Sequence, residues 1–157
     1  MRKINIYITQ IFKGKLESGE GKFCIYLELV NEDGTANPNT RMHKKGYTGT
    51  TKNRLAILAC IEALSHVTEC CEITIHIDSQ YMAGNEGRIS RWEASGWISG
   101  QGQVKNQDLW KHYRTAAGSH EITIVAEKRH SFRHVAYMEL QKEIELIEDK
   151  RKDEEDV

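Results

Sequence analysis

Apolar and polar residues alternate along the first fifty positions, the pattern of half-buried strands. Isoleucines occupy every second position of residues 4–8, and aromatic or aliphatic residues do so over residues 23–29. A third strand is expected over residues 41–48, after the turn sequence that runs from Asn31 to Gly34. Because short connections join the three segments, we expect them to form an antiparallel meander.

The apolar period becomes helical after Thr50 and Thr51, either of which is a suitable N-cap. Apolar residues then lie on more than one face up to about residue 67, so this helix is expected to be largely buried. Further strands are predicted at 72–77 and 122–126, and further helices at about 81–92, at 106–117 and from residue 133. The resulting order predicts an α/β fold: a mixed five-stranded sheet, with three antiparallel N-terminal strands and then parallel strands, flanked by helices around one core.

The C-terminal end is strongly charged, with eight acidic and four basic side chains in residues 142–157. Leu140, Ile144 and Ile147 extend an apolar stripe into this stretch. We therefore predict one long amphipathic helix that frays from about residue 149, and its role in binding a partner stays open. The expected organisation is a domain over residues 1–147 and a charged tail over 148–157.

Composition limits the class of protein. The 157 residues suit one ordinary domain, and the formal net charge is −1, although residues 1–141 carry 18 basic against 15 acidic side chains. No apolar run reaches the ~20 residues that span a bilayer, and the N-terminus lacks a signal-peptide pattern. The four cysteines show no metal-binding spacing. We expect reduced thiols, a cytoplasmic protein and no membrane partner.

Several segments match a known family. They are residues 50–58 (TTKNRLAIL), residues 75–81 (IHIDSQY), Trp92 followed by Gly96-Trp97, residues 104–110 (VKNQDLW), and Lys128-Arg129-His130. Together these segments resemble type I ribonuclease H of the bacterial kind, in order and with near-family spacing over about residues 4–145. The resemblance implies the ribonuclease H-like fold and an enzyme that cleaves the RNA strand of RNA/DNA hybrids.

The resemblance also implies four carboxylates that hold two divalent ions, usually Mg²⁺. The matching positions here are Thr9, Ala56, Asp78 and Met138, with Ile8 or Gln10 replacing Thr9 if the first strand shifts by one residue. Asp78 is the one carboxylate kept, and alone it binds Mg²⁺ weakly because it offsets little of the cost of dehydrating the ion. We expect little or no ribonuclease activity and no bound cofactor, with Mg²⁺ or Mn²⁺ used only if the protein is active.

Other residues near the implied site each have two interpretations. Asp78 is either a remaining metal ligand or the N-cap of the helix that follows it. His130 either matches the family's flexible-loop histidine, which is thought to help product departure, or is a surface histidine. Glu127 and Glu139 are either substitute carboxylates or solvated surface charges.

Basic and aromatic residues indicate a nucleic-acid interface. The cations form three groups: Arg41, Lys44, Lys45, Lys52 and Arg54; Lys128, Arg129 and Arg133; and Lys105, Lys111 and Arg114. Basic surfaces bind phosphate backbones without sequence preference, whereas a lone charge run is usually a solvated face. The resemblance implies contacts to the hybrid from Lys52, Asn53, Gln80, Trp92, Trp97, Lys105, Asn106 and Arg129. The tryptophans, including Trp110, lie in the family's protrusion, and they either stack on nucleic acid or pack the protrusion onto the body.

Three functions follow as hypotheses. The first is a catalytically impaired ribonuclease H-like protein that holds RNA/DNA hybrid or other duplex nucleic acid. The second is an active enzyme, in which Asp78 and a repositioned Glu127 or Glu139 hold a metal ion. The third is a protein-interaction module, with a protein partner, that uses the ribonuclease H fold as a scaffold.

Overall fold

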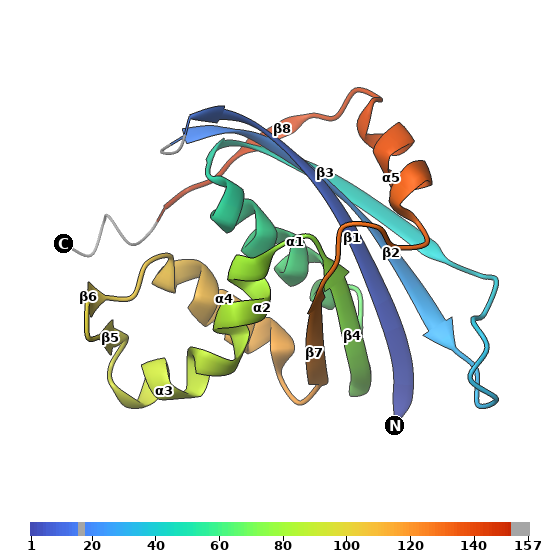
Figure 1. The fold of residues 1–157 in the computed structure, drawn as a ribbon, viewed down its shortest axis with the longest axis horizontal. Coiled ribbons are helices and arrows are strands. Elements are labelled where there is room, and N and C mark those ends of the chain that lie inside the picture. The colour runs from blue at the N-terminus through green and yellow to red at the C-terminus, as the bar shows by residue number, and fades with distance from the viewer. Residues whose placement is uncertain (16–17, 152–157) are drawn as a thin grey trace.

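A six-stranded mixed sheet with the strand order β7-β4-β1-β2-β3-β8 forms the centre of the computed structural model, which describes residues 1–15 and 18–151 (Figure 1). β1 (Arg2–Lys15), β2 (Ser18–Val30) and β3 (Arg41–Thr50) form the antiparallel meander. β4 (Cys71–Ile77) and β7 (Glu121–Ala126) extend the sheet parallel to β1. The predicted mixed α/β sheet is confirmed, and a sixth strand, β8 (Leu146–Glu148), adds to the five expected.

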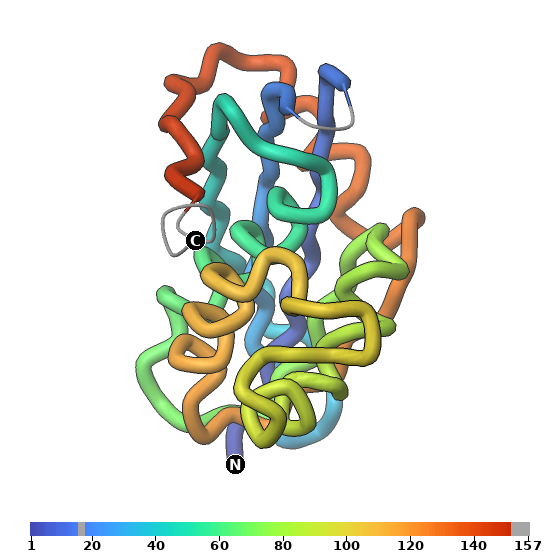
Figure 2. The backbone as a smooth tube through the Cα atoms, turned by 90° about the vertical axis from the view of Figure 1, so that its left-hand side faces the viewer, coloured from blue at the N-terminus to red at the C-terminus, as the bar shows by residue number. Residues whose placement is uncertain are grey.

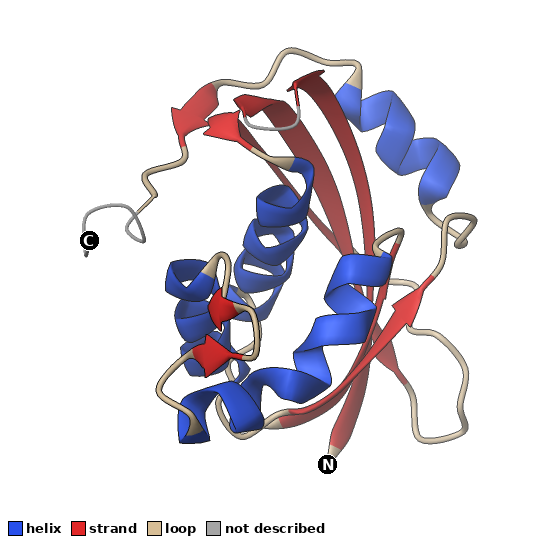
Figure 3. Cartoon of the chain, turned by 60° about the vertical axis from the view of Figure 1, so that its left-hand side comes forward, coloured by secondary structure: helices blue, strands red, loops and turns tan. Residues whose placement is uncertain are grey.

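Helices cover both faces of this sheet (Figure 3). The first face carries α1 (Lys52–Ser65), α2 (Gln80–Asn85), α3 (Ile89–Ala94) and α4 (Gln107–Ala117), and the other carries α5 (Arg133–Leu140). A 3-10 turn at Glu86–Arg88 joins α2 to α3, and the small hairpin of β5 (Ile98–Ser99) and β6 (Gly102–Gln103) joins α3 to α4. No helix within the described ranges is long and apolar enough to cross a membrane.

The alternation of side chains along the strands divides the apolar residues between two cores. The larger core lies between the sheet and α1, and Ile6, Ile8 and Ile25 enter it from the strands. The smaller core lies under α5, where Leu140 packs near Cys24. Each helix is therefore fixed to the sheet by the side chains that the strands direct toward it.

α1 is buried along most of its surface, as its apolar pattern predicts. The helix begins after Thr51, whose Oγ1 accepts a hydrogen bond from the backbone N–H of Arg54 at 3.1 Å. This bond identifies Thr51 as the N-cap, and Thr50 ends the preceding strand.

The chain after α5 differs from the prediction. α5 ends at Leu140, and β8 runs parallel to Gly46–Thr48 of β3, as the red segment at the sheet edge shows (Figure 2). A strand forms here because the edge of β3 offers unpaired N–H and C=O groups, which β8 satisfies. Gly46 leaves the necessary room, since a Cβ at this position would lie 2.6 Å from Leu146 Cδ2. The long fraying helix predicted through Ile147 is wrong.

Asp149 makes the residues after β8 part of the folded unit. Its side chain is 3% exposed and accepts two hydrogen bonds from the Arg54 guanidinium, at 2.8 and 3.0 Å. Asp108 of α4 accepts two more from Arg54, both at 2.9 Å. Burial opposes the charged form of Arg54, but the hydrogen bonds that it donates to the two carboxylates raise its pKa. Glu148, in β8, and the buried Asp149 are the first two residues of the predicted tail, and both contact the rest of the fold. Residues 152–157 of the predicted tail lie outside the described ranges.

Candidate functional site

The parallel pairing of β1 with β4 stops at the carboxyl end of β4, while the longer strand β1 continues to Lys15. Ile8 pairs with Ile77 in this register, so the next residues, Thr9 in the middle of β1 and Asp78 just after β4, lie level with each other. This register removes the alternative shift to Ile8, which is a core residue with 1% of its surface exposed. Ligand sites of α/β sheets commonly form at such strand ends.

A pocket of about 80 Å³ lies beside Thr9 and Asp78, at the carboxyl end of β4, and we call it the strand-end pocket. It is lined by Ile8, Thr9, Gln10, Asp78, Lys128, Arg133 and Tyr137. Lys128 comes from the loop after β7, whereas Arg133 and Tyr137 come from α5, one helical turn apart. With one carboxylate and two cations, the lining has a formal charge of +1.

Two of the positions implied for carboxylates lie away from this pocket. Ala56 is 1% exposed within the larger core. Met138 is 58% exposed, because Ala136 and Leu140 occupy the face of α5 that packs on the sheet. The phase of the helix therefore directs Arg133 and Tyr137, one turn apart, into the pocket.

Asp78 is exposed and does not cap α2. The N-cap is Ser79, whose Oγ accepts a hydrogen bond from the Met82 N–H at 3.0 Å, so the capping interpretation of Asp78 is wrong. The Asp78 carboxylate lies at the pocket with Lys128 and Arg133 as its charged neighbours there.

The pocket lining does not fit Mg²⁺. This ion needs oxygen ligands in near-octahedral geometry, and its charge is offset by carboxylates. Asp78 supplies the pocket's single carboxylate, while the ammonium of Lys128 and the guanidinium of Arg133 repel a cation. Elsewhere in the described ranges, no three His, Cys, Asp or Glu side chains gather as metal ligands.

The two glutamates considered as substitute ligands are engaged elsewhere. Glu127 Oε1 lies 3.3 Å from Nδ1 of His76 on β4, although the two atoms are not aligned as a hydrogen bond. Glu139 accepts hydrogen bonds from Lys142 at 2.7 Å and Lys44 at 3.0 Å, which hold its pKa below its usual value. Neither glutamate lines the strand-end pocket.

His130 is buried, with 9% of its surface exposed, so the surface interpretation is wrong. Its Nδ1 accepts a hydrogen bond from the backbone N–H of Phe132 at 3.2 Å. The ring proton of the neutral imidazole therefore sits on Nε2, which lies 3.0 Å from Thr9 Oγ1 and 3.3 Å from the Ile8 carbonyl oxygen. These contacts to Ile8 and Thr9 thus fix the loop after β7 to the middle of β1.

Replacing His130 with asparagine should reduce the loss of stability in mild acid. Burial lowers the pKa of His130 below 6.5, although its bond to the Ile8 carbonyl opposes this. As the pH falls, His130 is therefore protonated in the unfolded chain before it is protonated in the folded protein. The contribution of neutral His130 to the free energy of unfolding is complete above pH 6.5 and is lost as the pH falls below this value. Urea unfolding at about pH 7.5 and 5.5 measures the difference, which should be larger in the wild type than in His130→Asn.

Two observations keep this pH comparison specific. The pKa of His43 is also lowered by burial, but His43 is present in both proteins, so its contribution cancels. His134→Asn removes an exposed histidine from α5 and should retain the wild-type pH dependence. An unchanged pH dependence in His130→Asn would contradict the assignment of a buried, neutral His130.

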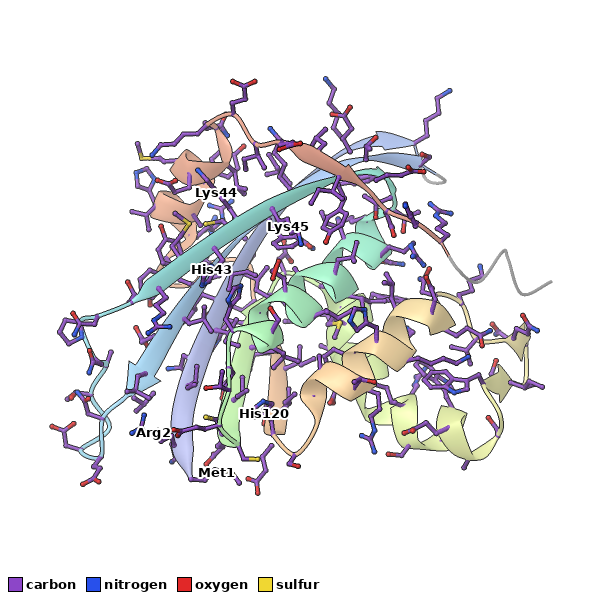
Figure 4. All side chains as sticks on the ribbon, turned by 180° about the vertical axis from the view of Figure 1, so that it is seen from behind. Met1, Arg2, His43, Lys44, Lys45 and His120 are labelled. Atoms are coloured by element: carbon purple, nitrogen blue, oxygen red, sulfur yellow. The ribbon has the colours of Figure 1, made fainter. Side chains whose placement is uncertain are left out.

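Many of the predicted cationic groups are neutralised by ion pairs. Lys44 pairs with Glu139 on the α5 side of β3, and Lys45 pairs with Glu62 of α1 on the opposite side (Figure 4). Arg54 is buried between two aspartates, and Arg114 pairs with Glu93. Within residues 1–15 and 18–151, no ion pair neutralises Lys128, Arg129 or Arg133, and two of these, Lys128 and Arg133, line the strand-end pocket.

The residues expected to contact the hybrid fall into two groups. Lys52, Asn53, Gln80, Lys105 and Arg129 are exposed. Asn106 is engaged within the protein, because its Nδ2 donates to the Tyr81 hydroxyl at 3.0 Å and its Oδ1 accepts from Arg54 at 3.4 Å. It also adopts a left-handed backbone with φ of 60° and precedes α4, so its place here is structural.

The three tryptophans form one aromatic cluster over α3 and α4. Trp110 is fully buried, and its Nε1–H donates to the Tyr81 hydroxyl at 3.1 Å. Trp92 lies 5.6 Å from Trp110 and 6.2 Å from Trp97 between ring centroids, and both outer rings are half-buried against the core. Packing of the protrusion onto the body is therefore their first role, while the exposed parts of Trp92 and Trp97 stay open to nucleic acid.

Three pocket residues, Lys128, Arg133 and Tyr137, are absent from the residues that the sequence assigns to the metal site. The sequence analysis names Lys128 and Arg133 only as members of a basic group. The available signal was the short spacing between Lys128 and the last helix, which brings the first turn of α5 close to Thr9 of β1.

Comparison with known proteins gives one consistent result. The sequence profile of RNase H matches residues 15–135. A ribonuclease H of Lachnoclostridium phytofermentans is 34% identical over 131 residues, which cover 82% of this chain and 81% of that protein. A type 1 ribonuclease H with the type 2 active-site motif superposes with a TM-score of 0.72 at 22% identity, over 87% of this chain and 69% of the other. A foamy viral protease–reverse transcriptase in complex with an RNA/DNA hybrid superposes with a TM-score of 0.56 at 15% identity, over 86% of this chain and 19% of the other.

Proposed function

Since the chain belongs to the ribonuclease H family, we propose that it binds RNA/DNA hybrid or another duplex nucleic acid and cleaves it slowly or not at all. The duplex lies across Thr9 of β1 and the carboxyl end of β4, above the strand-end pocket. Binding by this surface is electrostatic and independent of sequence, because its contacts are made to the phosphate backbone.

The charge of the strand-end pocket is the observation that carries this proposal. Two-metal cleavage of a phosphodiester requires carboxylates that hold both ions beside the reacting phosphate. Here neutral Thr9 lies level with Asp78, which is the one carboxylate of the pocket, and the other charged residues of the lining are the cations Lys128 and Arg133. A pocket of this composition favours an anion over a divalent cation.

The placement of the exposed polar residues supports a duplex at the same end of the molecule. β1 and β4 are parallel, and β3 runs in their direction because it is antiparallel to β2. α1 and α2 therefore each follow the carboxyl end of a strand, β3 and β4 respectively, that runs in the direction of β1, and their first turns present Lys52, Asn53 and Gln80 to solvent. With Arg129 nearby in the loop after β7, these side chains offer donors to phosphate and sugar oxygens.

A protein partner is the second candidate, favoured by apolar side chains on the outer face of α5. Val135 and Met138 are 47% and 58% exposed. Met138→Ser tests it, since this change should leave hybrid affinity unaltered and weaken any association through α5, measured by light scattering of the chain alone and with its partner.

A paired binding and cleavage assay tests the proposed function. Fluorescence anisotropy with a short labelled RNA/DNA hybrid in EDTA measures binding, and gel analysis of the same hybrid in Mg²⁺ or Mn²⁺ measures cleavage. We expect binding at low salt and no metal-dependent cleavage above the protein-free control. Asp78→Asn should cleave the same amount of hybrid as the wild type in this assay, because no metal-binding site depends on this carboxylate.

Metal-dependent cleavage that disappears in Asp78→Asn would overturn the proposal in favour of an active enzyme. Absence of hybrid binding at low salt would overturn it in favour of the protein-interaction role. Contaminating nuclease is excluded by following the activity across the elution profile of the protein, where it must track the chain.

A further inference from the structure

The strand-end pocket combines two cations with side chains that donate hydrogen bonds. We propose that it holds one phosphate group of the bound nucleic acid directly on Lys128 and Arg133, with no metal ion between protein and phosphate. This inference rests on the proposed function and specifies how the same site takes its ligand.

The two cations suit a phosphate in complementary ways. The guanidinium of Arg133 offers a planar fork of N–H donors that matches two phosphate oxygens, and the ammonium of Lys128 acts as a point charge. Both side chains are exposed, and within the described ranges neither forms an ion pair. Other cations of the predicted basic groups, such as Lys44 and Lys45, already have carboxylate partners. The pocket thus keeps its cations for an external anion.

A hydrogen-bond relay gives Thr9 a defined polarity. The N–H of Phe132 donates to Nδ1 of His130, and Nε2–H of His130 faces Thr9 Oγ1 at 3.0 Å. Because Thr9 Oγ1 accepts the hydrogen bond from Nε2–H of His130, the hydroxyl group of Thr9 can donate its own hydrogen bond into the pocket. His130 is therefore a positioning residue, and Thr9 supplies a neutral donor where a carboxylate would repel a phosphate.

Gln10 also lines the pocket, but it follows Thr9 on β1, so its side chain is directed to the opposite face of the sheet, where its Oε1 is buried without a hydrogen-bond partner in the described part of the protein. The hydroxyl of Tyr137 supplies a further donor at the rim.

Asp78 gives the proposal a test of opposite sign. In a pocket that holds a metal ion, loss of this carboxylate weakens binding of the phosphate that the ion bridges. In a pocket that holds the phosphate itself, the carboxylate repels the ligand, so its loss strengthens binding. Asp78→Asn should therefore tighten phosphate binding about threefold in EDTA, as expected for one removed charge at the edge of a solvated pocket.

Two-dimensional NMR of the full chain, titrated with inorganic phosphate in EDTA at constant ionic strength, measures this binding. We expect the amide signals of residues 8–10 and 78 to shift in a saturable way. The double variant Lys128→Gln/Arg133→Gln should weaken the affinity at least about tenfold. The matched control Arg2→Gln/Lys3→Gln removes the same two residue types at the start of β1, about 23 Å from Thr9, and should change the affinity less than twofold.

A short RNA/DNA hybrid added in EDTA identifies the source of the phosphate. The same pocket signals should shift, and inorganic phosphate should compete with the hybrid more than chloride of equal ionic strength does. If the hybrid binds but the pocket signals stay fixed, or if Asp78→Asn weakens phosphate binding, the inference is wrong while the proposed function stands. If free phosphate shifts these signals and the hybrid does not bind, both the backbone-phosphate assignment and the proposed function are wrong.

Discussion

Replacing Arg54 with methionine should lower the free energy of unfolding by about 3–5 kcal/mol, the largest loss expected from a single substitution on α1. The Arg54 guanidinium donates two hydrogen bonds each to Asp108 and Asp149, and the arginine side chain is 2% exposed. Without it, two carboxylates that are 9% and 3% exposed lose the guanidinium that both of them contact. Urea unfolding monitored by circular dichroism measures the loss.

The control for this change is Arg41→Met, which removes an exposed arginine from the start of β3. It should cost less than about 0.5 kcal/mol, as surface substitutions usually do. Replacing both aspartates with asparagine in the Arg54→Met background should recover part of the stability, because neutral amides cost less to bury than carboxylates that have lost the guanidinium. A loss below about 1 kcal/mol in Arg54→Met would show that the three side chains do not form a buried unit.

Hybrid affinity should fall about 500-fold between 50 and 200 mM salt, which is the largest change expected in binding. Five exposed cations lie on the proposed surface: Lys52, Lys105, Lys128, Arg129 and Arg133. Each phosphate neutralised releases counterions and contributes about −0.9 to the slope of log affinity against log salt, so five contacts give about −4.5. Anisotropy titrations over this salt range measure the slope.

Ion pairing within the protein lowers this number, because Lys44, Lys45, Arg54 and Arg114 already have carboxylate partners. If every cation of the three predicted groups contacted phosphate, the slope would approach −10 and the loss would reach about a millionfold. Lys45→Gln, whose lysine pairs with Glu62 at 3.1 Å, should therefore leave the slope unchanged, whereas Lys52→Gln should reduce it by about 1. A wild-type slope near −10 would mean that binding breaks the internal ion pairs, contrary to the expectation.

The main strands and α1 are predictable from the sequence because their determinants are local. Period-two alternation at Ile4, Ile6 and Ile8 places these side chains on the same face of β1, toward α1. The change to helical period after Thr51, together with its capping hydroxyl, defines the start of α1. The position of Thr9 opposite Asp78 also follows, once the resemblance aligns the two strands.

The remaining features depend on contacts between distant parts of the chain. β8 forms because Gly46, a hundred residues earlier, leaves space at the edge of β3, and no local pattern around Leu146 encodes this. The burial of His130 depends on Thr9, which lies 121 residues away in the sequence. The cationic lining of the strand-end pocket depends on the helical phase of α5, which Leu140 sets by packing on the sheet.

The aromatic cluster of Trp92, Trp97 and Trp110 has a consequence for spectroscopy. The sequence contains three tryptophans, so all indole emission of this chain arises from the cluster. Fluorescence reports on α3, α4 and the segment between them, and it does not directly sense α5 or β8. An emission change on adding an unlabelled ligand therefore locates that ligand's effect at the α3–α4 segment without any engineered probe.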